Sequence, residues 1–251
     1  MTHFRSILEI NGEEWMDSIG LESHERPDAV IVEGSWWRAE RQAWRLGHLS
    51  DVRELHFPDI FYGRWQGKNL LFCMAYGAPR TIEIIYLAGK MGAKLAIQIG
   101  TCGGLQSHLQ SGDIILPETA VGRDGVAHLF GDNEAAFADL AWVSKAEASL
   151  TAKDHSVYRG GHMTFASLFA ETPEMMAAWH QIGYLSVDME TATTFSVAEY
   201  CHMSALSMLV VWDDLTRGKR FLDPLSEEEL AALNRANQSV YAVALELVGQ
   251  L

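Results

Sequence analysis

The stretch from residue 95 to residue 125 constrains the fold of this chain more than any other. It opens with an apolar run of strand length at residues 95–99, breaks at the glycine-rich segment 100–104, and reaches a second apolar run at residues 114–116. Glycine has no Cβ and allows the backbone to come close to another group, and ligands of open α/β sheets bind beyond the carboxyl ends of strands. We therefore expect segment 100–104 to be a loop, which either binds a ligand or simply connects two strands.

Anion recognition by this loop would have to be local. Segment 100–104 fits neither GxGxxG nor GxxxxGK[ST], so a bound anion would be held by a nest of backbone amides. The formal net charge of −14 argues against a nucleic acid or an anionic membrane as partner, because either would require a basic surface. A small anionic substrate would need nearby cations, which draws attention to arginines close to glycine-rich loops.

Cysteine usage and the N-terminus indicate the compartment. The three cysteines, Cys73, Cys102 and Cys201, show no CxxC spacing, which predicts a reducing compartment with neither disulfides nor a metal site. The N-terminus lacks the basic and apolar regions of a secretory signal, and no apolar run approaches 18 residues. We expect a cytoplasmic protein.

Apolar strand-like runs alternate with helical patterns along the chain. Strands are expected at residues 29–32, 60–65, 69–74, 95–99, 114–116, 163–169 and 206–211. Helices are expected at residues 36–46, 80–91, 133–150, 173–182 and 188–200, and from the capping pattern at Ser226 to the C-terminus. Residues 1–27 are expected to form a short helix and an arm. Several wholly apolar strands imply a sheet covered on both faces, so we predict one α/β domain over residues 1–251, with a central mixed β-sheet flanked by helices.

Polar or glycine-rich residues follow several of these strands, at positions 34–35, 77, 100–101 and 213–214. Asp213 follows a mostly apolar run, so its carboxyl could have a raised pKa and act as a general acid; it could equally be a turn or N-cap aspartate. Asp188 and Glu190 flank Met189 at an expected helix start, where acidic residues also serve simply to complement the helix dipole.

The segments 100–105, 112–114 and 123–125 together resemble the signature of the nucleoside phosphorylase superfamily. This family includes purine nucleoside phosphorylases, uridine phosphorylases and methylthioadenosine-type nucleosidases. Residues 31–38, 187–192 and 210–213 are similar to further family motifs in the same order. The resemblance covers roughly residues 29–220. It implies a three-layer α/β fold, cleavage of an N-glycosidic bond, and a homo-oligomer, from dimer to hexamer, whose sites borrow residues from a neighbouring subunit.

The resemblance also implies roles at the sugar and at the base. Glu190 would hold the ribose hydroxyls and Met189 would pack beneath the sugar. Asp213 would protonate the leaving purine as a general acid. Thr164 and Phe165 would contact the base. A purine is favoured because the glutamine- and arginine-bearing insertion of uridine phosphorylases is not found between Phe165 and Glu190.

The same resemblance implies a phosphate site. Thr101, Gly34 and Arg38 would hold the phosphate nucleophile through a hydroxyl, an amide and a guanidinium. No cofactor is implied apart from inorganic phosphate as a co-substrate.

The chain departs from the family pattern around that phosphate. Gln98, a further substrate-binding candidate, stands where phosphorylases usually carry an arginine. His56 takes the place of the arginine that a neighbouring subunit usually donates, with Arg53 three residues away, and residues 35–36 replace an aspartate-proline pair. Losing one buried guanidinium–phosphate contact costs about 1.5 to 3 kcal/mol, or roughly one to two decades of affinity.

Three functions therefore remain open. The first is phosphorolysis, which gives free base and ribose 1-phosphate. The second is hydrolysis by water, which would need a carboxylate base such as Glu22, Glu33 or Glu83. The third is nucleoside binding without catalysis; the presence of both Glu190 and Asp213 argues against it, because a binding protein has no need of a leaving-group acid.

Overall fold

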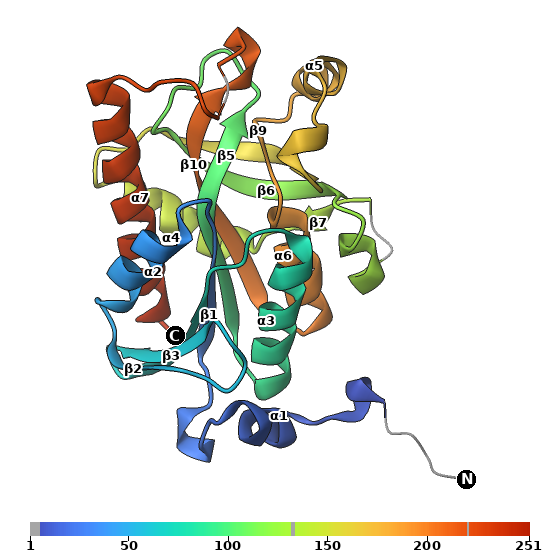
Figure 1. Ribbon diagram of the computed structural model, residues 1–251, viewed down its shortest axis with the longest axis vertical. Coiled ribbons are helices and arrows are strands. Elements are labelled where there is room, and N and C mark those ends of the chain that lie inside the picture. The colour runs from blue at the N-terminus through green and yellow to red at the C-terminus, as the bar shows by residue number, and fades with distance from the viewer. Residues whose placement is uncertain (1–5, 132–133, 220) are drawn as a thin grey trace.

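A mixed β-sheet runs through the middle of the molecule, with helices on both faces (Figure 1). The computed structural model describes residues 6–131, 134–219 and 221–251. The strands are β1 (Ala29–Gly34), β2 (Ser50–Glu54), β3 (Ile60–Trp65), β4 (Lys68–Cys73), β5 (Leu95–Gly104), β6 (Ile114–Arg123), β7 (Ala136–Phe137), β8 (Val157–Phe165), β9 (Ser186–Asp188) and β10 (Ser204–Asp214). The helices are α1 (Gly12–Ile19), α2 (Arg38–Leu46), α3 (Ala78–Met91), α4 (Leu140–Thr151), α5 (Pro173–Ile182), α6 (Thr191–Tyr200) and α7 (Glu227–Val248). The predicted α/β class with a central mixed sheet is confirmed.

Strand β5 is the centre of this sheet. The strand order is β10-β6-β8-β9-β5-β1-β4-β3-β2, and β5 also pairs with β10, so that β10, β6, β8, β9 and β5 close into a ring. Strand β5 is parallel to both β1 and β10. The carboxyl ends of β1, β5 and β10 therefore meet at one edge, which is where ligands bind in α/β proteins.

Helices cover both faces because the central strands are apolar on both. The first residues of β5, Leu95 to Ile99, have no solvent exposure, as expected of strands buried on two sides. Helices α3 and α6 pack together on one side, and α4 and α7 pack together on the other, beside α2 (Figure 1). In the part of the chain that the structure describes, no helix is both long and apolar enough to cross a membrane.

Two predicted helix starts are confirmed in detail. Helix α7 begins with a capping box, in which Ser226 accepts the Glu229 amide while the Glu229 carboxylate accepts the Ser226 amide. Helix α5 begins at Pro173 behind the N-cap Thr172. Both arrangements satisfy amides that the first turn leaves without intrahelical partners.

The prediction that segment 100–104 is a loop is wrong. Strand β5 continues to Gly104 and pairs with both β10 and β9 over these residues. The glycines permit a close approach between strands: a Cβ on Gly100 would lie 2.7 Å from the Gly34 carbonyl oxygen. The glycines correctly indicated that the backbone lies close to another group. At Gly100 that group is the neighbouring strand β1.

Several other boundaries differ from the sequence predictions. The helix expected at 188–200 begins at Thr191, because residues 186–188 pair with β5 and β8 as strand β9. A helix was expected from Asn133, and Asn133 itself lies outside the described residues. The helix observed there, α4, begins at Leu140 after the N-cap Asp139. The strand expected at 163–169 is β8, which ends at Phe165.

Strand β2 was missed because its sequence, SDVRE, is polar and mostly exposed. In the N-terminal segment, α1 and short 3₁₀ turns are present, and residues 1–5 lie outside the described residues.

Candidate active site

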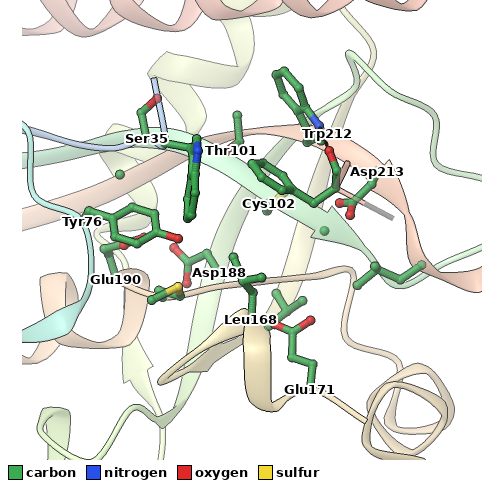
Figure 2. A pocket seen from close by; sticks show the side chains of 17 residues that line it. Ser35, Tyr76, Thr101, Cys102, Leu168, Glu171, Asp188, Glu190, Trp212 and Asp213 are labelled. Carbon is green, nitrogen blue, oxygen red and sulfur yellow. Dashed lines mark hydrogen bonds between the residues drawn. The ribbon is translucent and has the colours of Figure 1, made fainter. Parts of the chain in front are cut away.

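A pocket lies at the carboxyl ends of β1, β5 and β10, beside the junction of β9 and α6 (Figure 2). Among the predicted site residues, its lining includes Gly34, Thr101, Met189, Glu190 and Asp213. These residues come from four separate segments of the chain. The sheet brings them together because parallel strands place their carboxyl ends at the same edge.

The remaining predicted residues lie outside this lining. Gln98 and Thr164 are fully buried and donate hydrogen bonds to Asp188. Phe165 packs against Trp179, with ring centroids 5.3 Å apart. The Arg38 guanidinium lies 5.7 Å from the centroid of a pocket ring, Tyr76. These four residues do not line the pocket in this structure, so they would not touch a substrate bound there directly.

Glu190 is buried at one end of the pocket. It follows β9 and occupies the N-cap position of α6 without capping the helix through its side chain. Instead, its Oε1 accepts the Gly77 amide at 2.6 Å. A Cβ on Gly34 would lie 2.6 Å from the Glu190 Oε2, so only glycine at position 34 leaves room for this carboxylate. Burial, together with the neighbouring Asp188, raises the pKa of Glu190.

Asp188 is the centre of a buried hydrogen-bond network beside Glu190. Its carboxylate accepts bonds from Gln98 Nε2 at 2.7 Å, Thr164 Oγ1 at 2.9 Å, Thr191 Oγ1 at 2.6 Å and His162 Nε2 at 2.8 Å. Burial acts to raise the pKa of Asp188, but His162, Thr191 and Gln98 outweigh it and the pKa is lowered. The ionised Asp188 thus joins β5, β8 and α6 at the turn that carries Met189 and Glu190.

Gln98 has both ends of its amide occupied. Its Nε2 donates to Asp188, and its Oε1 accepts from Ser207 Oγ at 2.7 Å. Because the side chain is fully buried between β9 and β10, Gln98 supports the site from behind and offers no positive charge to a ligand.

The adjacent aspartates at the end of β10 have different roles. Asp214 caps a 3₁₀ turn, where its Oδ1 accepts the amides of Thr216 and Arg217. Asp213 lines the pocket and is only 7% exposed. Burial raises the pKa of Asp213 to about 7, helped by Asp214 and Asp223. The turn-aspartate interpretation thus applies to Asp214, while Asp213 stays the candidate for a general acid.

Glu171 is a pocket carboxylate that sequence reasoning missed. It lies after the 3₁₀ turn Leu168–Ala170 and lines the pocket within electrostatic range of Asp213. Burial, and then Asp213, raise the pKa of Glu171 to about 7. Its sequence position, directly before Thr172 and Pro173, looks like an ordinary acidic residue at a helix start, so no local signal distinguished it.

Ser35 was also missed as a pocket residue. It was noted only as a departure from the family pattern, yet it is 1% exposed and lines the pocket next to Gly34. Within the described residues its Oγ has no hydrogen-bond partner. A buried polar group without a partner is costly, so a ligand that supplied one would be favoured here.

The carboxylates proposed from sequence as bases for hydrolysis lie away from the pocket lining. Glu33 lies on β1, is fully buried and is bound by Arg45 and Arg41. Glu83 pairs with Arg80 on the surface, and Glu22 is exposed. Arg53, the cation considered for phosphate binding, donates to Glu25 at 2.7 Å.

The carboxylates and aromatic rings divide the pocket into two ends. Figure 2 shows Glu190 and Tyr76 at one end and Asp213 with Trp212 at the other, with Asp188 between them. Among the described residues that line the pocket there is no lysine, arginine or histidine. The described residues also contain no group of three or more histidine, cysteine or acidic side chains arranged to hold a metal ion.

Comparisons with known proteins agree with this geometry. A family model described as the phosphorylase superfamily matches residues 46–249. The DeoD-type purine nucleoside phosphorylase of Proteus mirabilis (strain HI4320) is 30% identical over 239 residues, covering 92% of this chain and 96% of the relative. The corresponding protein of Alkaliphilus metalliredigens (strain QYMF) is 26% identical over 211 residues, covering 80% and 88%. Crystal structures of uridine phosphorylase from Vibrio fischeri ES114 share the fold, with a TM-score of 0.78 and 22% identity over 92% of this chain and 95% of theirs.

Proposed function

The chain belongs to the phosphorylase superfamily, and on that basis we propose that it cleaves the N-glycosidic bond of a purine nucleoside by phosphorolysis. The products would be the free base and ribose 1-phosphate. The observation that carries the proposal is the presence of Asp213 and Glu190 at opposite ends of one pocket. Several relatives named as purine nucleoside phosphorylases support the choice of a purine.

The chemistry requires help for both the sugar and the base. Bond cleavage passes through a state in which positive charge develops on the ribose, so groups that bind this state more tightly than the substrate accelerate the reaction. In our proposal Glu190 holds the ribose hydroxyls, and Met189 packs beneath the sugar. Asp213 donates a proton to the purine as the bond breaks. The ionised Asp188 behind them stabilises the developing charge.

Phosphate would bind where β1 and β5 end. The hydroxyls of Thr101 and Ser35 line this region, and both can donate hydrogen bonds to an anion. Arg38, whose guanidinium lies over the pocket residue Tyr76, is a candidate for a countercharge on the same chain. We further propose that the protein works as a homo-oligomer in which a neighbouring subunit supplies additional positive charge.

Phosphate dependence tests this proposal. Cleavage of inosine or adenosine in phosphate-free buffer should fall by about two decades or more relative to buffer with millimolar phosphate, because the nucleophile that attacks C1′ is then missing and only slow attack by water remains. The measurement is the initial rate of base release, with ribose and ribose 1-phosphate quantified separately. Equal rates with and without phosphate, and ribose as the product, would contradict phosphorolysis.

Hydrolysis is the second candidate because one observation favours it. The described pocket lining carries no cation, and Gln98 stands where a cation was expected. Glu171, with its pKa raised to about 7, could accept the proton of an attacking water molecule. This alternative predicts ribose as the sugar product, which the same assay detects.

Catalysis on a neutral purine nucleoside should fall as the pH rises through about 7. The pKa of Asp213 is raised to about 7, so its carboxyl holds a proton below this pH and loses it above. If that proton goes to the leaving base, kcat/KM is constant at lower pH and decreases tenfold per unit well above pH 7. The measurement is a pH profile of kcat/KM for inosine. A flat profile from pH 6 to pH 9 would contradict the assignment of Asp213 as the acid.

A further inference from the structure

The pocket has an unusual combination of charge and aromatic surface. Its carboxylates are Glu171, Asp188, Glu190 and Asp213, and its aromatic rings are Trp36, Tyr76, Trp212 and Phe221. None of the described lining residues carries a positive charge. A neutral purine does not require this excess of acidic groups, whereas a cation would be attracted by each ionised carboxylate beside it.

The aromatic rings form a continuous wall from one end of the pocket to the other. Trp36 contacts Tyr76 and Phe221 edge-on, with ring centroids 5.8 Å and 5.5 Å apart. Phe221 in turn lies 6.1 Å from Trp212. The faces of tryptophan, tyrosine and phenylalanine rings attract cations, and aromatic cages of this kind recognise alkylated nitrogen cations. The wall therefore adds to the attraction of the carboxylates.

Glu171 and Asp213 both line the pocket and lie within electrostatic range of each other. Burial raises the pKa of both carboxyls to about 7; Asp213 adds to the shift of Glu171, while Asp214 and Asp223 add to the shift of Asp213. No cation in the described structure therefore balances the two carboxyls fully. The other charges near Asp213 are already engaged or acidic. Lys219 is paired with Glu229, while Asp214 and Asp223 add negative charge.

We propose that this site selects nucleosides whose base carries a positive charge, such as N-alkylated purine or pyridinium nucleosides. The inference rests on the proposed function, because it names the substrate class for the same bond cleavage. Glu171 and Asp213 bind the charged base, and the aromatic wall formed by Trp36, Phe221 and Trp212 covers it.

The chemistry of such a substrate balances without a proton donor. The phosphate oxygen forms a bond to C1′ while the C1′–N bond breaks. The electron pair of the broken bond returns to the base nitrogen and neutralises its positive charge. The base therefore leaves as a neutral molecule, and the proton of hydrogen phosphate stays on the sugar phosphate. Asp213 then acts as a countercharge, and its proton is not needed.

The test compares charged and neutral substrates in the full-length protein. We would measure kcat/KM at pH 8, where Glu171 and Asp213 are mostly ionised, for guanosine and for nicotinamide riboside, whose pyridinium charge does not depend on pH. Each would be measured in the wild type and in Glu171→Gln. The ratio of charged to neutral kcat/KM should fall by about tenfold or more in the variant, since a charge-assisted contact contributes about 1.5 to 3 kcal/mol. Comparing this ratio between the wild type and Glu171→Gln cancels the intrinsic lability of the charged nucleosides, which is the same in both measurements.

Glu174→Gln is the matched control. Glu174 lies three residues further along the chain, in the first turn of α5, and its carboxyl is exposed and outside the pocket lining. The same chemical change there should leave both rates and their ratio unaltered. Circular dichroism of the variants would verify that Glu171→Gln is folded.

Binding provides a second measurement that does not depend on turnover. Quenching of tryptophan fluorescence in a phosphate-free titration should give a lower Kd for nicotinamide riboside in the wild type than in Glu171→Gln. That Kd should also decrease as the pH rises from 6 to 8, because Glu171 and Asp213, with pKa values of about 7, become ionised over this range. Cleavage of inosine should instead become slower over the same range.

The outcomes separate this inference from the function on which it rests. Cleavage of neutral nucleosides with an unchanged charged-to-neutral ratio in Glu171→Gln would overturn the charge selection alone. Absence of cleavage of every nucleoside would overturn the proposed function and the inference together. A reduced ratio in Glu171→Gln, with Glu174→Gln behaving as wild type, is the expected result.

Discussion

Replacement of Asp213 by asparagine should lower kcat/KM for inosine by about 10²- to 10⁴-fold, the range attributed to one general acid. Asparagine preserves the shape of the side chain and removes only the proton that would be donated to the purine. The side chain is buried in the pocket, and its pKa of about 7 means that about half of the Asp213 carboxyls carry a proton in neutral solution. The same variant should lose less activity on nicotinamide riboside, about tenfold, because a charged base leaves without protonation and only the countercharge of Asp213 is removed.

The matched control for this variant is Asp214→Asn. Asp214 is the adjacent residue, but it caps a 3₁₀ turn and lies outside the pocket lining. An amide oxygen can still accept the Thr216 amide, so we expect kcat/KM within about threefold of wild type and a loss of at most about 1 kcal/mol of stability. Near-wild-type cleavage of inosine by Asp213→Asn would remove Asp213 from its role as general acid.

The sequence predicted the architecture well where a local pattern determined it. Apolar runs located β1 and β10, and the capping pattern at Ser226 located the start of α7. The segment 100–104 shows where local reasoning fails. Glycines there indicated close approach, but only the register of β5 with β1 and β10 reveals that the backbone continues as a strand.

The site was predictable only in part for a related reason. Motifs along the chain identified Asp213, Glu190 and Thr101, which the sheet brings to one pocket. Glu171 and Ser35 could not be selected, because one looks like an acidic residue at a helix start and the other like a small residue in a loop. Their importance depends on burial and on distant neighbours, which no local spacing encodes.

Gln98 shows how little the identity of one residue in the sequence reveals about its structural role. Its identity correctly indicated that a positive charge is missing. Its structural role, a buried amide bridging Asp188 and Ser207, depends on three strands that meet only in the folded molecule. The described pocket lining is acidic and carries no cation, so the nature of the nucleophile and the charge of the substrate both depend on what balances these carboxylates.

Glu33→Gln should lower the free energy of unfolding by about 3 to 5 kcal/mol, the cost of removing one partner of a buried ion pair. Glu33 is fully buried, and its carboxylate accepts two hydrogen bonds from Arg45, at 2.8 and 3.1 Å, and one from Arg41 at 3.2 Å. Arg45 is itself only 3% exposed. The substitution would leave a buried guanidinium without its countercharge, between β1 and α2. The measurement is the urea midpoint at an unchanged m-value.

Glu83→Gln is the control, because it makes the same chemical change in a surface pair. Glu83 is 48% exposed and pairs with Arg80 at 2.6 Å, so we expect a loss of no more than about 1 kcal/mol. Both glutamates were candidates for a hydrolytic base, and the two variants also test that role. If Glu33→Gln were as stable as wild type but inactive, Glu33 would have a catalytic role in place of the structural one. If Glu33→Gln is less stable yet retains kcat on inosine under conditions where it remains folded, the ion pair serves to fix α2 against β1, and the pocket carboxylates alone carry the chemistry.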